Sequence, residues 1–136
     1  MWRYALSYLI ALVTFVAADM AWIGTMASRF YKPMMGDIVT PNVNYTAAIV
    51  FYAVYPIGLV IFAINPALKA DSAATALGYG ALFGFFTYFT YNLTNQALLR
   101  NWSTPLTLVD IAWGTTAAAL ASLVTFWVIG KFVSNV

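Results

Sequence analysis

Long apolar runs separated by short polar segments dominate the chain. Each run reaches the length of about 20 residues that a helix needs to cross the hydrocarbon core of a bilayer. Because lipid offers the backbone no hydrogen bonds, each run must be helical. We therefore predict an all-α integral membrane protein, a single transmembrane domain over residues 1–136 that forms an antiparallel four-helix bundle. The four predicted spans cover roughly residues 4–27, 45–65, 73–98 and 105–130.

The segments between the runs set the predicted topology. Residues 28–44 hold Pro33, Gly36 and Pro41, so we expect a long extramembrane loop there. The other two connections are short, which makes successive helices antiparallel and puts both termini on one side of the membrane. Lysine and arginine divide evenly between the two sides, Arg3, Lys69 and Lys131 against Arg29, Lys32 and Arg100. The α-amino group and Arg3 then favour cytoplasmic termini.

Aromatic residues lie near the ends of the predicted spans, where tryptophan and tyrosine favour the headgroup region. We interpret six of them as interfacial anchors, with no further role. They are Trp2, Tyr4, Tyr31, Tyr45, Trp102 and Trp127.

Composition narrows the chemistry that the chain can perform. It is 63% hydrophobic and 7% charged, against about 25% charged in an average soluble domain. It contains no cysteine, histidine or glutamate, which excludes disulfides, thiol chemistry, imidazole catalysis and the usual zinc or haem ligands. The net charge of +2 is dispersed, so there is no basic patch suited to nucleic acid. We expect no metal and no cofactor, and membrane lipid as the general partner.

Small residues mark the faces on which the helices should pack. They are spaced by four, as Gly80 and Gly84 in the third run and as Gly114, Ala118 and Ser122 in the fourth. Membrane helices approach closely through such residues, so we predict that these faces point inward, and the same signal leaves homo-oligomerisation open. In the second run, Pro56 removes a helical hydrogen bond and predicts a bend.

The first and fourth runs share a short motif, Asp19-Met20-Ala21-Trp22 and Asp110-Ile111-Ala112-Trp113. An aspartate and a tryptophan three residues apart lie on one face of a helix. An ionisable group at membrane depth is costly, which makes both aspartates candidates for function. The structural alternative is a carboxyl that reaches headgroup water, or one that hydrogen-bonds a neighbouring helix to fix its register.

Polar residues of all four runs should lie in one layer. Counting about 1.5 Å of rise per residue from the predicted helix ends places Asp19, Tyr52, Asn92 and Asp110 about 8 to 12 Å below the same surface. We therefore predict a polar pocket in one leaflet, open toward the long loop. Its candidate ligand-binding residues are Asp19, Trp22, Tyr52, Tyr55, Tyr88, Tyr91, Asn92, Asn95, Asp110 and Trp113.

Several of these segments are also typical of a known family. They include Asp19-Met20-Ala21-Trp22, Arg29-Phe30-Tyr31, Phe51-Tyr52, Asn65-Pro66-Ala67-Leu68, Gly80-Ala81-Leu82-Phe83-Gly84, Tyr91-Asn92-Leu93-Thr94-Asn95 and Val109-Asp110-Ile111-Ala112-Trp113-Gly114. With them the chain resembles the bacterial membrane-protein family called domain of unknown function 2177. The resemblance implies a small multi-pass protein of the inner membrane, and it implies no activity. It also leads us to expect aspartate in many members at the position of Asn92, so that the pocket here would be less acidic.

Three functions fit this pattern. The first is a binding or carrier protein that holds a small molecule, lipid headgroup or cation in the polar pocket, with protonation of Asp19 and Asp110 coupled to occupancy. The second is a structural or assembly subunit without a ligand. The third is an intramembrane hydrolase that uses the two carboxyls as a shared-proton dyad. We favour the first over an enzyme.

Overall fold

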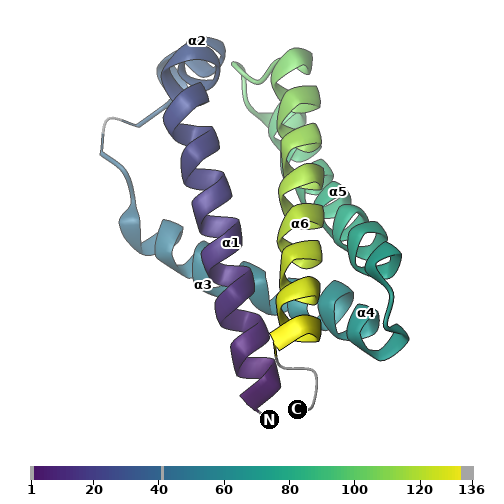
Figure 1. Cartoon of the computed structure of the whole chain (residues 1–136). Coiled ribbons are helices and arrows are strands. Elements are labelled where there is room, and N and C mark those ends of the chain that lie inside the picture. Colours follow the sequence, from purple (N-terminus) through teal and green to yellow (C-terminus); the bar gives the residue numbers. More distant parts are fainter. Residues whose placement is uncertain (1, 41, 133–136) are drawn as a thin grey trace.

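The computed structural model describes residues 2–40 and 42–132, and the regular secondary structure of these residues is all helical (Figure 1). Four long helical stretches confirm the four predicted runs. The first is α1 (Trp2–Met26), which continues through η1 (Ala27–Tyr31), α2 (Lys32–Met35) and η2 (Gly36–Ile38). The second consists of α3 (Tyr45–Leu59), η3 (Val60–Ile64) and α4 (Asn65–Ala70). The third and fourth are α5 (Ala73–Leu98) and α6 (Thr104–Phe132).

Local hydrogen bonds explain where two of the helices begin. The Oδ1 atom of Asn44 accepts a hydrogen bond from the backbone N–H of Ala47 at 3.1 Å, just before α3. The Oγ atom of Ser72 accepts one from the backbone N–H of Thr75 at 3.1 Å, just before α5. Each such cap contributes about 1 kcal/mol to helix stability. These polar residues at the ends of the apolar runs therefore set the helix boundaries.

Helical backbone extends further into residues 28–44 than the sequence indicated. Pro33 does not end the helix, and it lies within the continuous helical stretch Trp2–Ile38, close behind the π-helical turn η1. The backbone turns at Gly36, whose φ of 64° is favourable for glycine and costly for other residues. The position of this segment outside the membrane stays a prediction.

Three stretches have the length and composition to cross a membrane. They are Trp2–Ile38, Tyr45–Ala70 and Thr104–Phe132, with mean hydropathies of 1.9, 2.4 and 1.5. Helix α5 is 26 residues long but does not reach this hydropathy, because its C-terminal half is rich in threonine, tyrosine and asparagine. Its membrane crossing therefore stays a prediction.

Helices α5 and α6 make the most extensive contact between two elements of the described chain. A Cβ atom added at Gly80 would lie 2.7 Å from Ser122 Oγ, and one added at Gly84 would lie 2.7 Å from Ala118 Cβ. Both distances are too short for a side chain, so glycine is what lets the two helices approach. The predicted inward faces are confirmed.

The second stretch crosses α1 and α6 obliquely (Figure 1). Pro56 lies inside α3, and four residues later the backbone widens into the π-helical turn η3. The irregularity predicted in this span thus takes the form of a wider turn, which is a common way for a helix to change direction.

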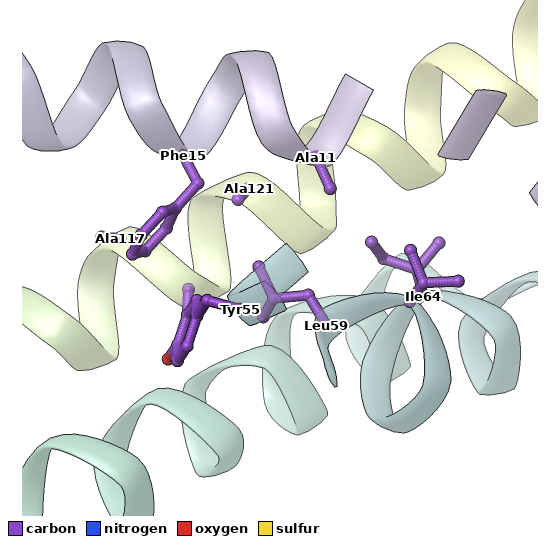
Figure 2. Close-up of a cluster of buried hydrophobic side chains, with 9 residues drawn as sticks. Ala11, Phe15, Tyr55, Leu59, Ile64, Ala117 and Ala121 are labelled. Carbon is purple, nitrogen blue, oxygen red and sulfur yellow. The ribbon is translucent and has the colours of Figure 1, made fainter. Parts of the chain in front are cut away.

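A hydrophobic core joins α1, α3, η3 and α6 (Figure 2). Phe15 of α1 is fully buried and packs with Tyr55 and Leu59 of α3 and with Ala117 and Ala121 of α6. The start of α1 and the end of α6 lie at the same end of the bundle (Figure 1). Asp19 follows Phe15 by one helical turn, so this core borders the layer that holds the predicted site.

Candidate binding pocket

The shared motif of α1 and α6 brings two indole rings together. The rings of Trp22 and Trp113 are stacked, with centroids 4.6 Å apart and planes inclined by 4°. Helices α1 and α6 run in opposite directions (Figure 1), and each contributes one indole to this stack. Trp113 donates directly to Asp19, whereas Trp22 reaches Asp110 through the Tyr31 hydroxyl.

Asp19 is held by side chains from two other helices. Its Oδ1 atom accepts a hydrogen bond from Trp113 Nε1 at 2.8 Å, and its Oδ2 atom accepts one from the Tyr52 hydroxyl. The residue is 6% exposed. Asp19 thus links α1 to α3 and α6 at a single buried point, as the layer hypothesis requires.

Asp110 is held in the same way from the other side. Its Oδ1 atom accepts a hydrogen bond from the Tyr31 hydroxyl at 2.8 Å, and its Oδ2 atom accepts one from Asn92 Nδ2 at 2.7 Å. Trp22 Nε1 donates to the Tyr31 hydroxyl at 2.8 Å, and Trp102 Nε1 donates to Asn92 Oδ1 at 3.2 Å. Asn92 is fully buried.

Trp102 fixes the orientation of the Asn92 amide, because an indole N–H can only donate. Trp102 occupies the carbonyl oxygen of Asn92, so Asn92 must present its amide N–H to Asp110. Trp22 donates to the Tyr31 hydroxyl, and that hydroxyl donates to Asp110 Oδ1. Asp110 is thus an acceptor at both oxygens.

The two carboxyl groups do not share a hydrogen bond. Their four oxygens accept from four different donors, and no hydrogen bond of the described residues joins Asp19 to Asp110. The contact that a shared-proton dyad requires is not formed.

An aromatic pocket of about 610 Å³ lies beside this network. Its volume falls within the range of about 300 to 1,000 Å³ that is usual for small-molecule sites. Eight of the predicted residues line it, namely Asp19, Trp22, Tyr52, Tyr55, Tyr88, Tyr91, Asp110 and Trp113. Eight others complete the lining, namely Ile23, Ala27, Tyr31, Lys32, Met35, Val39, Phe51 and Thr87. Half of the lining is therefore aromatic, and the binding role of these residues stays a prediction.

Two predicted residues lie outside the lining. Asn92 sits behind Asp110, where its amide orients the carboxyl and does not face the pocket. Asn95 lies one helical turn further along α5, and its backbone carbonyl accepts from the N–H of Leu99 at the end of the helix. On α5 the lining thus ends at Tyr91, and the binding role of Asn92 and Asn95 stays a prediction.

The interpretation of Tyr31 and Trp102 as interfacial anchors was wrong. Tyr31 hydrogen-bonds Asp110 and Trp22, and Trp102 is 7% exposed and hydrogen-bonds Asn92. Tyr31 was missed because its partner is 79 residues away in the sequence, and because Pro33 and Gly36 favoured a loop there. The one available signal was that Arg29-Phe30-Tyr31 is among the segments that carry the family resemblance.

Comparison with known proteins agrees with this architecture. A sequence profile of the family described as predicted membrane protein, domain of unknown function 2177, matches residues 4–127. No curated protein and no solved structure matches the chain. Because the profile covers most of the sequence, the chain belongs to the domain of unknown function 2177 family of predicted membrane proteins.

Proposed function

We propose that the aromatic pocket binds a small molecule and that this chain is a membrane-embedded binding or carrier protein. The observation that carries the proposal is an open volume of about 610 Å³ beside a fully hydrogen-bonded pair of buried acids. Two other hollows on the described residues have volumes of about 630 and 710 Å³, but neither has an acidic side chain in its lining. The combination of an open volume with two buried acids therefore favours an occupant over a purely structural role.

The walls of the pocket are fixed before any ligand arrives. Trp22 and Trp113 hold each other by stacking, and the hydroxyls of Tyr31 and Tyr52 are held by carboxyl groups. The Tyr55 hydroxyl is within hydrogen-bond distance of Thr87 Oγ1, at 2.9 Å. Side chains that are already ordered lose little conformational entropy when a ligand binds. This preorganisation supports binding, whereas the separate donors of the two carboxyls give the hydrolase alternative no support.

The cellular position of the pocket follows from the topology that we propose. The chain would lie in the inner membrane, with both termini in the cytoplasm and residues 28–44 on the other side. Residues of η1 and α2, together with Val39, line the pocket, so its lining would reach the outer surface. A ligand would then enter from the side opposite to the termini.

A cavity-filling substitution tests the proposal. Ala27 lines the pocket, and Ala27→Phe would place a ring in it. Ala21 lies on the same helical stretch but is exposed and outside the lining, so Ala21→Phe is the matched control. Both variants and the wild type would be purified from the same membranes and analysed by native mass spectrometry for bound small molecules.

We expect a bound species of constant mass on the wild type and on Ala21→Phe, and its loss from Ala27→Phe. The proposal is refuted if the wild type carries no such species, or if Ala27→Phe retains it. Tryptophan fluorescence of the two variants would show that the Trp22–Trp113 pair is intact in both.

A further inference from the structure

We infer that the aromatic pocket selects a small organic cation of the ammonium type, an inference that rests on the binding function proposed above. Two acidic side chains line the pocket, Asp19 and Asp110, and one basic side chain, Lys32. The acids are 6% and 9% exposed, and every side chain that hydrogen-bonds them is neutral. Lys32 is exposed, so its ammonium group can extend into water. A cationic ligand would supply the positive charge that the buried acids lack.

The hydrogen-bond directions strengthen this charge argument. Asp110 accepts at both oxygens, from the Tyr31 hydroxyl and from the Asn92 amide. Hydrogen bonds that a carboxyl accepts from N–H and O–H groups favour its charged form. A positive charge close to Asp110 would stabilise that form further.

The aromatic lining matches an alkylated ammonium group. When the nitrogen is quaternary, as in choline, the group has no N–H to donate but is attracted to the faces of tryptophan, tyrosine and phenylalanine rings. The pocket holds all three types, among them Phe51, Tyr55 and Trp113. Tyr88 also lines the pocket, and its hydroxyl takes part in none of the hydrogen bonds described for residues 2–40 and 42–132. This hydroxyl can hydrogen-bond a polar substituent of the same ligand.

The same side chains do not suit a metal ion. No group of three or more acidic, histidine or cysteine residues that could hold a metal occurs in the described part of the chain. The carboxyl oxygens of Asp19 and Asp110 are each engaged by a donor, whereas calcium and magnesium require at least about six free oxygen ligands. The pocket therefore offers a ligand space and aromatic surfaces, and few free lone pairs.

The ammonium group could belong to a free molecule or to a lipid headgroup, so the experiment separates the two sources. The full chain would be placed in nanodiscs of phosphatidylglycerol, which has no ammonium group, and titrated with choline by calorimetry. The neutral isostere 3,3-dimethylbutan-1-ol has the same shape without the charge and would be titrated in parallel. Repeating the choline titration in phosphatidylcholine nanodiscs shows competition if the lipid headgroup occupies the pocket.

Two pairs of variants test the residues. Asp110→Asn should weaken choline binding about 100-fold, the usual loss when one partner of a buried charge contact is removed. Asp71→Asn is its control, because Asp71 is an exposed acid with a φ of 49° that asparagine also tolerates. Phe51→Leu should weaken binding about 30-fold through the lost aromatic face. Phe86→Leu, exposed and outside this lining, is its control.

We expect choline to bind and the alcohol to bind at least about 30-fold more weakly. Equal binding of choline and the alcohol refutes cation selection. If Ala27→Phe then abolishes the binding of both compounds, the pocket is still their binding site and the proposed binding function is supported. If choline does not bind to the wild type, cation selection is also refuted. The binding function is then tested separately, by the mass-spectrometric search for a copurified small molecule. If Asp110→Asn fails to fold, Phe51→Leu decides the matter, since Phe51 is 39% exposed.

Discussion

Replacing the Tyr52 hydroxyl measures how strongly the site binds α3 to α1. Tyr52→Phe removes one donor to Asp19 and leaves the ring in place. The matched control is Tyr8→Phe, because the Tyr8 hydroxyl also joins α1 to α3 but donates to a neutral acceptor, the backbone carbonyl of Ala53, at 2.7 Å. The same atom is therefore removed at the same helix interface, once opposite a carboxyl and once opposite an amide.

The expected magnitudes follow from the two acceptors. Hydrogen bonds between membrane helices contribute about 0.6 kcal/mol on average and about 1.7 kcal/mol at most, and bonds to charged groups are about twice as strong as neutral ones. We expect Tyr8→Phe to lower the free energy of unfolding by about 0.6 kcal/mol and Tyr52→Phe by about 1.5 kcal/mol.

Unfolding with sodium dodecyl sulfate in mixed micelles, followed by tryptophan fluorescence, gives both free energies. A double-mutant cycle of Tyr52→Phe with Asp19→Asn isolates the coupling between the two side chains, which should approach the full effect of Tyr52→Phe. The reasoning is wrong if Tyr8→Phe costs as much as Tyr52→Phe, or if the cycle shows no coupling.

Two further predictions test the packing and the topology. Gly84→Leu should lower the free energy of unfolding by about 1 to 3 kcal/mol through overpacking against Ala118. Gly78→Ala, which meets nothing within 4 Å, should leave it unchanged or raise it by about 0.5 to 1 kcal/mol; equal effects of the two would contradict the close approach. Because the chain has no cysteine, single cysteines at Asn42 and Lys69 report sidedness in intact cells. A membrane-impermeant maleimide should label Asn42→Cys directly and Lys69→Cys only after permeabilisation, and the reverse order would overturn the proposed orientation.

Local chemistry made the helix boundaries predictable. Helix α5 covers the predicted residues 73–98 because Ser72 caps its first turn. The inward faces of α5 and α6 were predictable because small residues recur at the helical period, which is also a local property. Pro33 led us to expect no helix in residues 28–44, because a proline usually breaks a helix, whereas here the helix continues past Pro33 after a π-helical turn.

The site was predictable only in part. The Asp-x-x-Trp repeat identified both acids and both indoles, because residues three apart share a helix face whatever the tertiary structure. The choice of partners was not contained in the motif. Trp113 donates to the aspartate of the opposite helix, and Tyr31 reaches Asp110 only because a π-helical turn lies before α2. These pairings depend on how the helices are arranged in space, and no local pattern encodes them.

The hydrogen bond between Asp19 and Trp113 has a consequence for the synthesis of the protein. The two residues are 94 positions apart, and a ribosome adding about 5 to 20 residues per second needs about 5 to 20 s to cover that distance. If the helices enter the bilayer in chain order, α1 is inserted long before α6. During that time Asp19 Oδ1 lacks the hydrogen bond that Trp113 later donates. A ribosome that stalls before α6 would thus leave an incompletely satisfied acid in the membrane, a defect that membrane quality control can recognise.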